Sequence, residues 1–261
     1  PEEAEAIKIC FYDEKTLSNV AKDGAENGFS FIIIPATSTV HLAYAQNAPE
    51  YEDIFLKTVL GWISGVHLDD LGKVPPKVFN GQTGEESAEK AIVMHCSLPE
   101  GKLASIGIIN LFQQGNGDTI TFPSTGFSVT DCLVNGEKKN FAAYLKEIEA
   151  DSRLPLVADY SGTMINVSFQ KIDTETGAVS FYAPVFKNVE YKIAEPVSDY
   201  VKSFSEAIPK DLNTSFSCNC ILNFLYSELE GKITKGMTGP ITFGEIAHQL
   251  LNQTLVYLEI L

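Results

Sequence analysis

The sequence has few basic residues for its length. Nineteen lysine and arginine residues stand against 34 aspartate and glutamate residues, so the formal net charge is −15. Nucleic acids and anionic lipid surfaces attract clustered basic residues, and a strongly acidic chain is repelled by both. We therefore expect neither a nucleic acid nor a membrane as a partner.

Long apolar runs are also absent. The longest clean run, Phe29 to Ile34, is far shorter than the ~20 residues that a membrane-spanning helix needs. The acidic start of the chain, Pro1 to Glu5, is unlike a secretory signal. The five cysteines are an odd number and lie mostly in apolar stretches, which favours reduced, buried thiols over a disulfide framework. These features predict a cytoplasmic protein.

Standard catalytic and cofactor-binding motifs are missing as well. The sequence has no Walker loop, no dinucleotide fingerprint, no zinc-protease or serine-hydrolase motif and no kinase signature. We therefore predict no catalytic set of residues, no metal site and no cofactor.

What the chain does contain is a pattern of many short strands and fewer helices. Strict alternation of strand and helix is not seen, which predicts an α+β fold with mixed or mostly antiparallel sheets. The apolar runs 91–98 and 105–112, joined by the turn 99–102, predict a β-hairpin. Two further expectations are a strand over 40–45 and a helix over 51–60.

Other local signals lie in the second half of the chain. Asn135-Gly136 predicts a tight turn, and the periodic segment Asn140–Ala150 predicts an amphipathic helix capped by Asn140. Apolar runs on both sides of 173–177 predict a second hairpin. The polar segment 113–118 is the best candidate boundary between residues 1–117 and residues 118–261.

The most unusual segment is 236–246, which contains three glycines, a proline and Glu245. We expect a tight loop followed by a short helix with Glu245 in its first turn. In a functional interpretation the loop approaches a ligand closely and Glu245 binds an amine or hydroxyl group. In a structural interpretation the acid only stabilises the helix N-terminus. The sequence leaves both open.

Cysteine and histidine residues offer two weaker candidates. Cys218 and Cys220 could be a metal pair, a redox pair or a nucleophile, but zinc needs four ligands and a nucleophile needs a nearby base. Buried structural thiols are the favoured interpretation. His67 and Asp69 would share one face of a strand, which suits a metal site or a polar pocket wall. A strand end that runs into a solvated acidic turn explains them equally well.

The C-terminal half also resembles a known family. The matching order is the turn Val134-Asn-Gly136 before a Tyr-containing helix, then Phe216-Ser-Cys218, then Gly239–Ile246, then Asn252-Gln-Thr254. This order is similar to that of the C-terminal domain of bacterial FIST (F-box and intracellular signal transduction) sensory proteins. Leu60–Gly65 is similar to a glycine-containing stretch of the FIST N-terminal domain. An arginine that follows the cysteine in the family is absent, and Cys220-Ile221-Leu222 stands there.

The resemblance implies a fold, a function and a set of site residues. It implies a FIST-N-like half (1–117) and a FIST-C-like half (118–261), with two sheets packed face to face and helices outside, an αββα-like sandwich. The implied function is a non-enzymatic sensor of amino acids or related metabolites that acts in intracellular signalling through a separate signalling protein. The implied ligand-binding residues, to which His67 is added as a pocket wall, are Glu245, Gly244, Phe243, Gly239, Cys218, Asn252, Gly61 and Gly65.

Two other classes of function stay open at this point. One is a Cys- or acid-assisted hydrolase or transferase that uses Cys218 with Glu245 or His67. The other is a protein-interaction scaffold with a flat apolar surface. A Cys218 thiol of depressed pKa in contact with a histidine would favour the enzyme, whereas a buried neutral thiol would favour the sensor.

Overall fold

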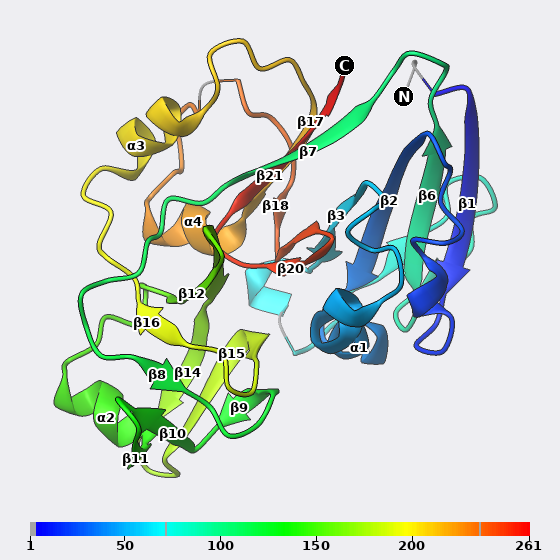
Figure 1. Ribbon diagram of the computed structural model, residues 1–261. Helices are drawn as coiled ribbons and strands as arrows, with labels where there is room; N and C mark the ends of the chain where they lie inside the picture. Colours follow the sequence, from blue (N-terminus) through cyan, green and yellow to red (C-terminus); the bar gives the residue numbers. More distant parts are fainter. Residues whose placement is uncertain (1–3, 71, 235) are drawn as a thin grey trace.

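The computed structural model describes residues 4–70, 72–234 and 236–261, and strands dominate it (Figure 1). An α+β fold with several β-sheets, as predicted, is confirmed, although the helices are short and few. None of the helices in the described part of the chain is long and apolar enough to cross a bilayer.

Sheet 1 has six strands in the order β1-β6-β2-β3-β19-β20. Strands β2 and β3 run parallel, and the other neighbours are antiparallel. Strands β19 and β20 come from the C-terminal part of the chain, whereas the other four strands lie within its first 100 residues. Segments far apart in the sequence therefore form one sheet. Its strands are β1 (Ala6–Tyr12), β2 (Gly28–Pro35), β3 (Val59–Ser64), β6 (Ala91–Ser97), β19 (Glu245–Ala247) and β20 (Gln249–Leu251).

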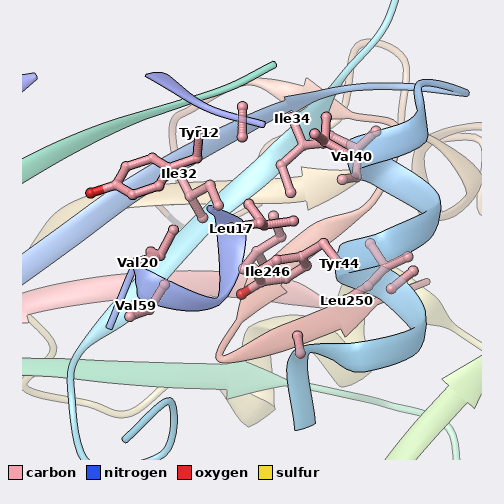
Figure 2. Packing of buried hydrophobic residues seen from close by; sticks show 14 of the residues in the cluster. Tyr12, Leu17, Val20, Ile32, Ile34, Val40, Tyr44, Val59, Ile246 and Leu250 are labelled. Carbon is pink, nitrogen blue, oxygen red and sulfur yellow. The ribbon is translucent and has the colours of Figure 1, made fainter. Parts of the chain in front are cut away.

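One face of sheet 1 is covered by helix α1 (Thr39–Asn47) and the 3-10 turn η1 (Leu17–Asn19). Ile32 and Ile34 of β2 point toward Val40 and Tyr44 of the helix, as Figure 2 shows. All four side chains are fully buried. The strand that was expected over 40–45 is therefore wrong, because Ser38 caps a helix there by accepting a hydrogen bond from the His41 amide at 3.2 Å.

Sheet 2 has four strands in the order β18-β17-β21-β7, with β17 and β18 parallel. Cys218, Val256 and Leu258 of this sheet pack against Phe29 and Leu60 of sheet 1 in one hydrophobic cluster. Its other face carries Leu255, which packs with Phe204 of helix α3 (Tyr200–Ala207). The strands are β7 (Ala104–Ile109), β17 (Thr214–Cys220), β18 (Ile241–Thr242) and β21 (Leu255–Ile260).

Sheets 3 and 4 lie at the lower left of Figure 1. Their common core contains Phe122, Phe141 and Phe181, and helix α2 (Phe141–Glu147) packs on it. Sheet 3 is β11 (Glu137–Asn140), β10 (Asp131–Val134), β8 (Ile120–Thr121), β16 (Tyr191–Ile193), β12 (Leu156–Tyr160) and β13 (Thr163–Val167); sheet 4 is β14 (Phe169–Asp173), β15 (Ala178–Val185) and β9 (Gly126–Val129). The remaining elements are the pair β4 (Val78–Phe79) and β5 (Glu86–Ser87), helix α4 (Ile221–Tyr226), and the 3-10 turns η2 (Ala48–Glu50) and η3 (Leu68–Asp70).

The predicted hairpin of 91–98 with 105–112 is wrong. The turn itself forms, since the Lys102 amide donates to the Pro99 carbonyl at 3.2 Å. However, β6 already has β1 on one edge and β2 on the other, so β7 cannot pair with it and joins β21 in sheet 2 instead. The helix expected over 51–60 is also wrong, because turns occupy most of that segment and β3 begins at Val59.

Several local predictions are confirmed. Asn140 caps α2 by accepting from the Ala143 amide at 2.9 Å. Asn135 and Gly136 form the β10–β11 turn with φ of 51° and 87°. β14 and β15 pair on either side of 174–177. The division at residues 117/118 stays a prediction, and strands from both sides of it pair with one another in sheets 1 and 2.

Candidate functional site

A pocket of about 120 Å³ lies on the face of sheet 2 that α4 and the segments 229–234 and 236–241 cover. The strands β17, β18 and β21 supply its floor. Both apolar and polar side chains line it. The described residues that line it are Ser217, Cys218, Asn219, Phe224, Leu229, Lys232, Thr234, Met237, Gly239, Ile241 and Leu255.

Strand register determines which side chains face this pocket. Asn219 pairs with Ile241 on one side and with Leu255 on the other, and residues paired across strands share a face of the sheet. Cys218 pairs with Val256 and points to the opposite face, where it packs against sheet 1. Cys218 therefore borders the pocket mainly through its backbone.

The polar side chains of the pocket form hydrogen bonds to neighbouring protein groups. Ser217 Oγ donates to the Thr238 carbonyl at 3.0 Å, which ties the strand to the covering segment. Asn219 Oδ1 accepts from Asn223 Nδ2 at 3.0 Å. Lys232 Nζ donates to the Ser227 carbonyl at 3.3 Å. Lys232 is the one ionised side chain among the described residues of the lining.

Glu245 lies behind the floor of the pocket rather than inside it. It begins β19 of sheet 1, so the predicted helix with Glu245 in its first turn is wrong. Its exposed fraction is 0%. Thr254 Oγ1 donates to its Oε2 at 2.9 Å, and Thr242 Oγ1 lies 2.8 Å from its Oε1. Thr242 pairs with Cys220, which places this cluster on the face of sheet 2 opposite the pocket.

Burial raises the pKa of Glu245 to about 8, although hydrogen bonds from Thr242, Thr254 and Cys220 oppose the shift. The number of protons available for hydrogen bonds in this cluster supports a neutral Glu245 carboxyl. Thr242 Oγ1 also lies 3.3 Å from the Asn219 carbonyl, and one hydroxyl proton serves only one of these two oxygens. A protonated Glu245 donates to Thr242 and frees Thr242 to donate to Asn219, so every group is satisfied.

The two cysteines of β17 are buried. Burial raises the pKa of both the Cys218 and the Cys220 thiol well above the usual range. The Cys218 thiol donates to the Gly61 carbonyl of sheet 1 at 3.6 Å. No histidine in the described part of the chain contacts either thiol: His95 binds Tyr12 and Ser30, and His248 binds the Ile54 carbonyl.

The glycines implied as pocket residues are sites of close packing. A Cβ atom on Gly61 would lie 1.7 Å from the Ile32 carbonyl oxygen of the neighbouring strand. A Cβ on Gly65 would lie 2.1 Å from the ring of Phe243, and one on Gly239 would lie 1.8 Å from the Ser217 carbonyl oxygen. Gly244, with φ of 151°, leads into β19 and its carbonyl accepts from the Ile63 amide at 2.8 Å.

Two further candidates lie elsewhere. The His67 side chain is 74% exposed, and its Nδ1 is 3.5 Å from Asp69 Oδ2, so it belongs to a solvated acidic turn. Asn252 is fully buried, and its Nδ2 donates to the Leu251 carbonyl at 3.0 Å. Within the described ranges, no three His, Cys, Asp or Glu residues are placed to hold a metal ion.

Of the nine site residues expected from the sequence, Cys218 and Gly239 border the pocket. Glu245, Phe243 and Gly244 lie in or next to β19, and His67 stands apart at the surface. The sequence reasoning missed Asn219, Lys232 and Met237. Alternation along β17 could have indicated Asn219, since 217 and 219 share a face when 218 is apolar and buried.

The whole chain, residues 1–261, matches the model of a family of unknown function, DUF6976, and therefore belongs to that family. No curated protein and no solved structure matches the chain.

Proposed function

We propose that this member of the DUF6976 family is a non-enzymatic small-molecule-binding protein that acts as a sensor in intracellular signalling. The pocket on sheet 2 is the observation that carries the proposal. It combines apolar walls from Phe224, Leu229 and Leu255 with the polar groups of Asn219 and Lys232. Concave, largely apolar sites with a few convergent polar groups are typical of ligand binding.

The size of the pocket limits the ligand. Its volume of about 120 Å³ is near the ~150 Å³ of an apolar protein cavity that accommodates benzene. Sites for drug-sized molecules are larger, roughly 300–1,000 Å³. A metabolite of a few heavy atoms therefore fits, whereas a nucleotide does not. Amino acids and related metabolites, the ligands that the FIST resemblance implies, are of suitable size.

The state of the cysteines supports binding over catalysis. A nucleophilic cysteine needs thiolate character and a base within hydrogen-bond reach. Cys218 has a raised pKa and donates to a backbone carbonyl, and no described histidine is in contact with it. In the proposed function the ligand-bound state is recognised by a separate signalling protein in the cytoplasm. We also propose that sheets 1 and 2 are the two central layers of an αββα sandwich, in which the pocket lies beneath an outer helical layer.

A thermal-shift screen against amino acids and small organic acids and amines tests the binding function. A ligand at 100 times its dissociation constant adds roughly 2.7 kcal/mol, which is a shift of a few degrees for a chain of this size. The variant Ile241→Trp places a large ring at the pocket and should abolish the shift. Ile7→Trp is a matched control, because Ile7 on β1 is 42% exposed and Ile241 is 43% exposed.

Two outcomes would contradict the proposal. One is a folded sample that responds to none of the compounds. The other is a response that is the same in Ile241→Trp and in the wild-type protein, because binding would then occur elsewhere.

A further inference from the structure

We infer that the ligand is a small aliphatic monocarboxylate without an ammonium group, an inference that rests on the proposed binding function. The first observation is the charge of the pocket. Lys232 is the one ionised side chain among the described lining residues. No ion pair of Lys232 is found within the described part of the chain, and its Nζ contacts the Ser227 carbonyl at 3.3 Å. Its charge is therefore available to an anion.

The charge of Lys232 is opposite in sign to the overall charge of the protein. The chain has a formal net charge of −15, which repels anions at long range. A cation that borders a pocket whose described lining holds no acidic side chain gives an anionic ligand one favourable location. A carboxylate meets a lysine ammonium through charge-assisted hydrogen bonds, which are about twice as strong as neutral ones.

The second observation is that no carboxylate is present among the described residues of the lining to form an ion pair with an ammonium group. Glu245, the acid expected to bind an amine, lies on the opposite face of sheet 2 with no exposed surface. Glu228 and Glu230 flank Leu229 in the chain, but neither lines the pocket. Transfer of an ammonium group from water to a partly apolar site without a carboxylate partner, beside the ammonium group of Lys232, is unfavourable. A free amino acid therefore fits this pocket less well than the same molecule without its amine.

The third observation is the apolar remainder of the lining. Phe224, Leu229, Met237, Ile241 and Leu255 surround the space beside Lys232. An aliphatic chain buries its methylene groups there, at about 0.8 kcal/mol for each. The hydroxyls of Ser217 and Thr234 already donate to backbone carbonyls, which leaves few free hydroxyl donors for a hydroxylated or sugar-like ligand. A short hydrocarbon chain with one carboxylate satisfies all three observations.

Three compounds that share one hydrocarbon skeleton test this inference by isothermal titration calorimetry at pH 7. They are 4-methylpentanoate (carboxylate only), leucine (carboxylate and ammonium) and 3-methylbutylamine (ammonium only). We expect 4-methylpentanoate to bind at least tenfold more tightly than either of the other two. Lys232→Met, which keeps an unbranched side chain only one heavy atom shorter and removes the charge, should weaken its binding at least tenfold, and Lys232→Arg should restore it.

The outcomes separate this inference from the proposed function. If leucine or the amine binds most tightly and Ile241→Trp abolishes that binding, the pocket binds ligands but the ligand class is wrong. The same conclusion follows if 4-methylpentanoate binds Lys232→Met as tightly as the wild-type protein. If the three compounds and neutral 3-methylbutanol all fail to bind the folded protein, the inference is overturned, and a blank in the thermal-shift screen then overturns the proposed function as well.

Discussion

The hydroxyl of Thr254 donates to Oε2 of Glu245 at 2.9 Å and links two β-sheets. Thr254 directly precedes β21 of sheet 2, and Glu245 is the first residue of β19 in sheet 1. Both residues are buried. The carboxyl is therefore part of the contact between the sheets and is not exposed to the pocket.

This position predicts a pH-dependent stability. Burial raises the pKa of Glu245 from its ordinary 4.5 to about 8. Below the ordinary value both the folded and the unfolded carboxyl are protonated. Between that value and about 8 the unfolded chain ionises first, so this group lowers stability by up to about 1.4 kcal/mol per pH unit as pH rises. Above about pH 8 the carboxyl is ionised in both states, so its contribution to the free energy of unfolding no longer changes with pH.

Glu245→Gln should remove this pH dependence. Glutamine keeps the shape and the donor capacity of the neutral acid, so the variant should match wild type near pH 4.5 and exceed it in free energy of unfolding at pH 8. Urea denaturation across this range measures the difference. Glu100→Gln, at an exposed glutamate, is the control and should follow the wild-type curve. A Glu245→Gln variant that is less stable than wild type at pH 8 would show that the carboxylate, not the neutral acid, is the buried form.

The thiols predict a pattern of chemical labelling. Cys96, Cys132, Cys218 and Cys220 are buried, and Cys10 is half-buried. Burial raises the pKa of Cys132 to about 11, so few thiolates form at neutral pH. We expect a thiol reagent at pH 8 to modify Cys10 first and the other four only after unfolding in urea. Mass spectrometry locates the label, and rapid modification of Cys218 in the native protein would support the enzyme alternative.

The contact between Gly65 and Phe243 predicts a coupled effect of mutations. Gly65→Ala inserts a methyl group into the space of the ring and should cost about 1–3 kcal/mol. Phe243→Leu should relieve part of this cost, so the double-mutant cycle should give a coupling of at least about 0.5 kcal/mol. Gly81→Ala is the control, because nothing lies within 4 Å of a Cβ there. Additive effects in the cycle would contradict the contact.

A buried chain of hydrogen bonds on sheet 1 predicts one histidine tautomer. Tyr12 donates to Asp23 Oδ2 at 2.9 Å, so its single proton is used there. His95 Nε2, at 2.8 Å from the Tyr12 hydroxyl, must then be the donor. Its Nδ1 accepts from Ser30 Oγ at 2.8 Å. Burial lowers the pKa of His95, which keeps the ring neutral at pH 7.

Nitrogen-15 NMR of the imidazole at pH 7 should show a protonated Nε2 and an unprotonated Nδ1. Tyr12→Phe leaves the buried Nε2–H of His95 without an acceptor and should cost about 1–3 kcal/mol in free energy of unfolding. Observation of the Nδ1–H tautomer in the wild-type protein would contradict the arrangement of donors.

Local chemistry explains which parts of the fold were predictable. The helix cap at Asn140 and the turn at Asn135-Gly136 depend on a few neighbouring residues, and both formed as expected. The hairpin between 91–98 and 105–112 had an equally good turn, yet its strands separated because both edges of β6 were already occupied. Glu245 followed a loop that is typical of a helix start, but pairing with Trp62 made it part of a strand.

The sequence by itself determined the α+β class, the acidic surface and the local turns and caps, since composition and short-range hydrogen bonding control these features. The tertiary structure decided the site. Sheet 2 has two faces, and the register of β17 sends Asn219 toward the pocket and Cys218 toward sheet 1. Whether Glu245 could bind a ligand depended on which face its strand covered. That choice results from the pairing of segments far apart in the chain, which no local pattern encodes.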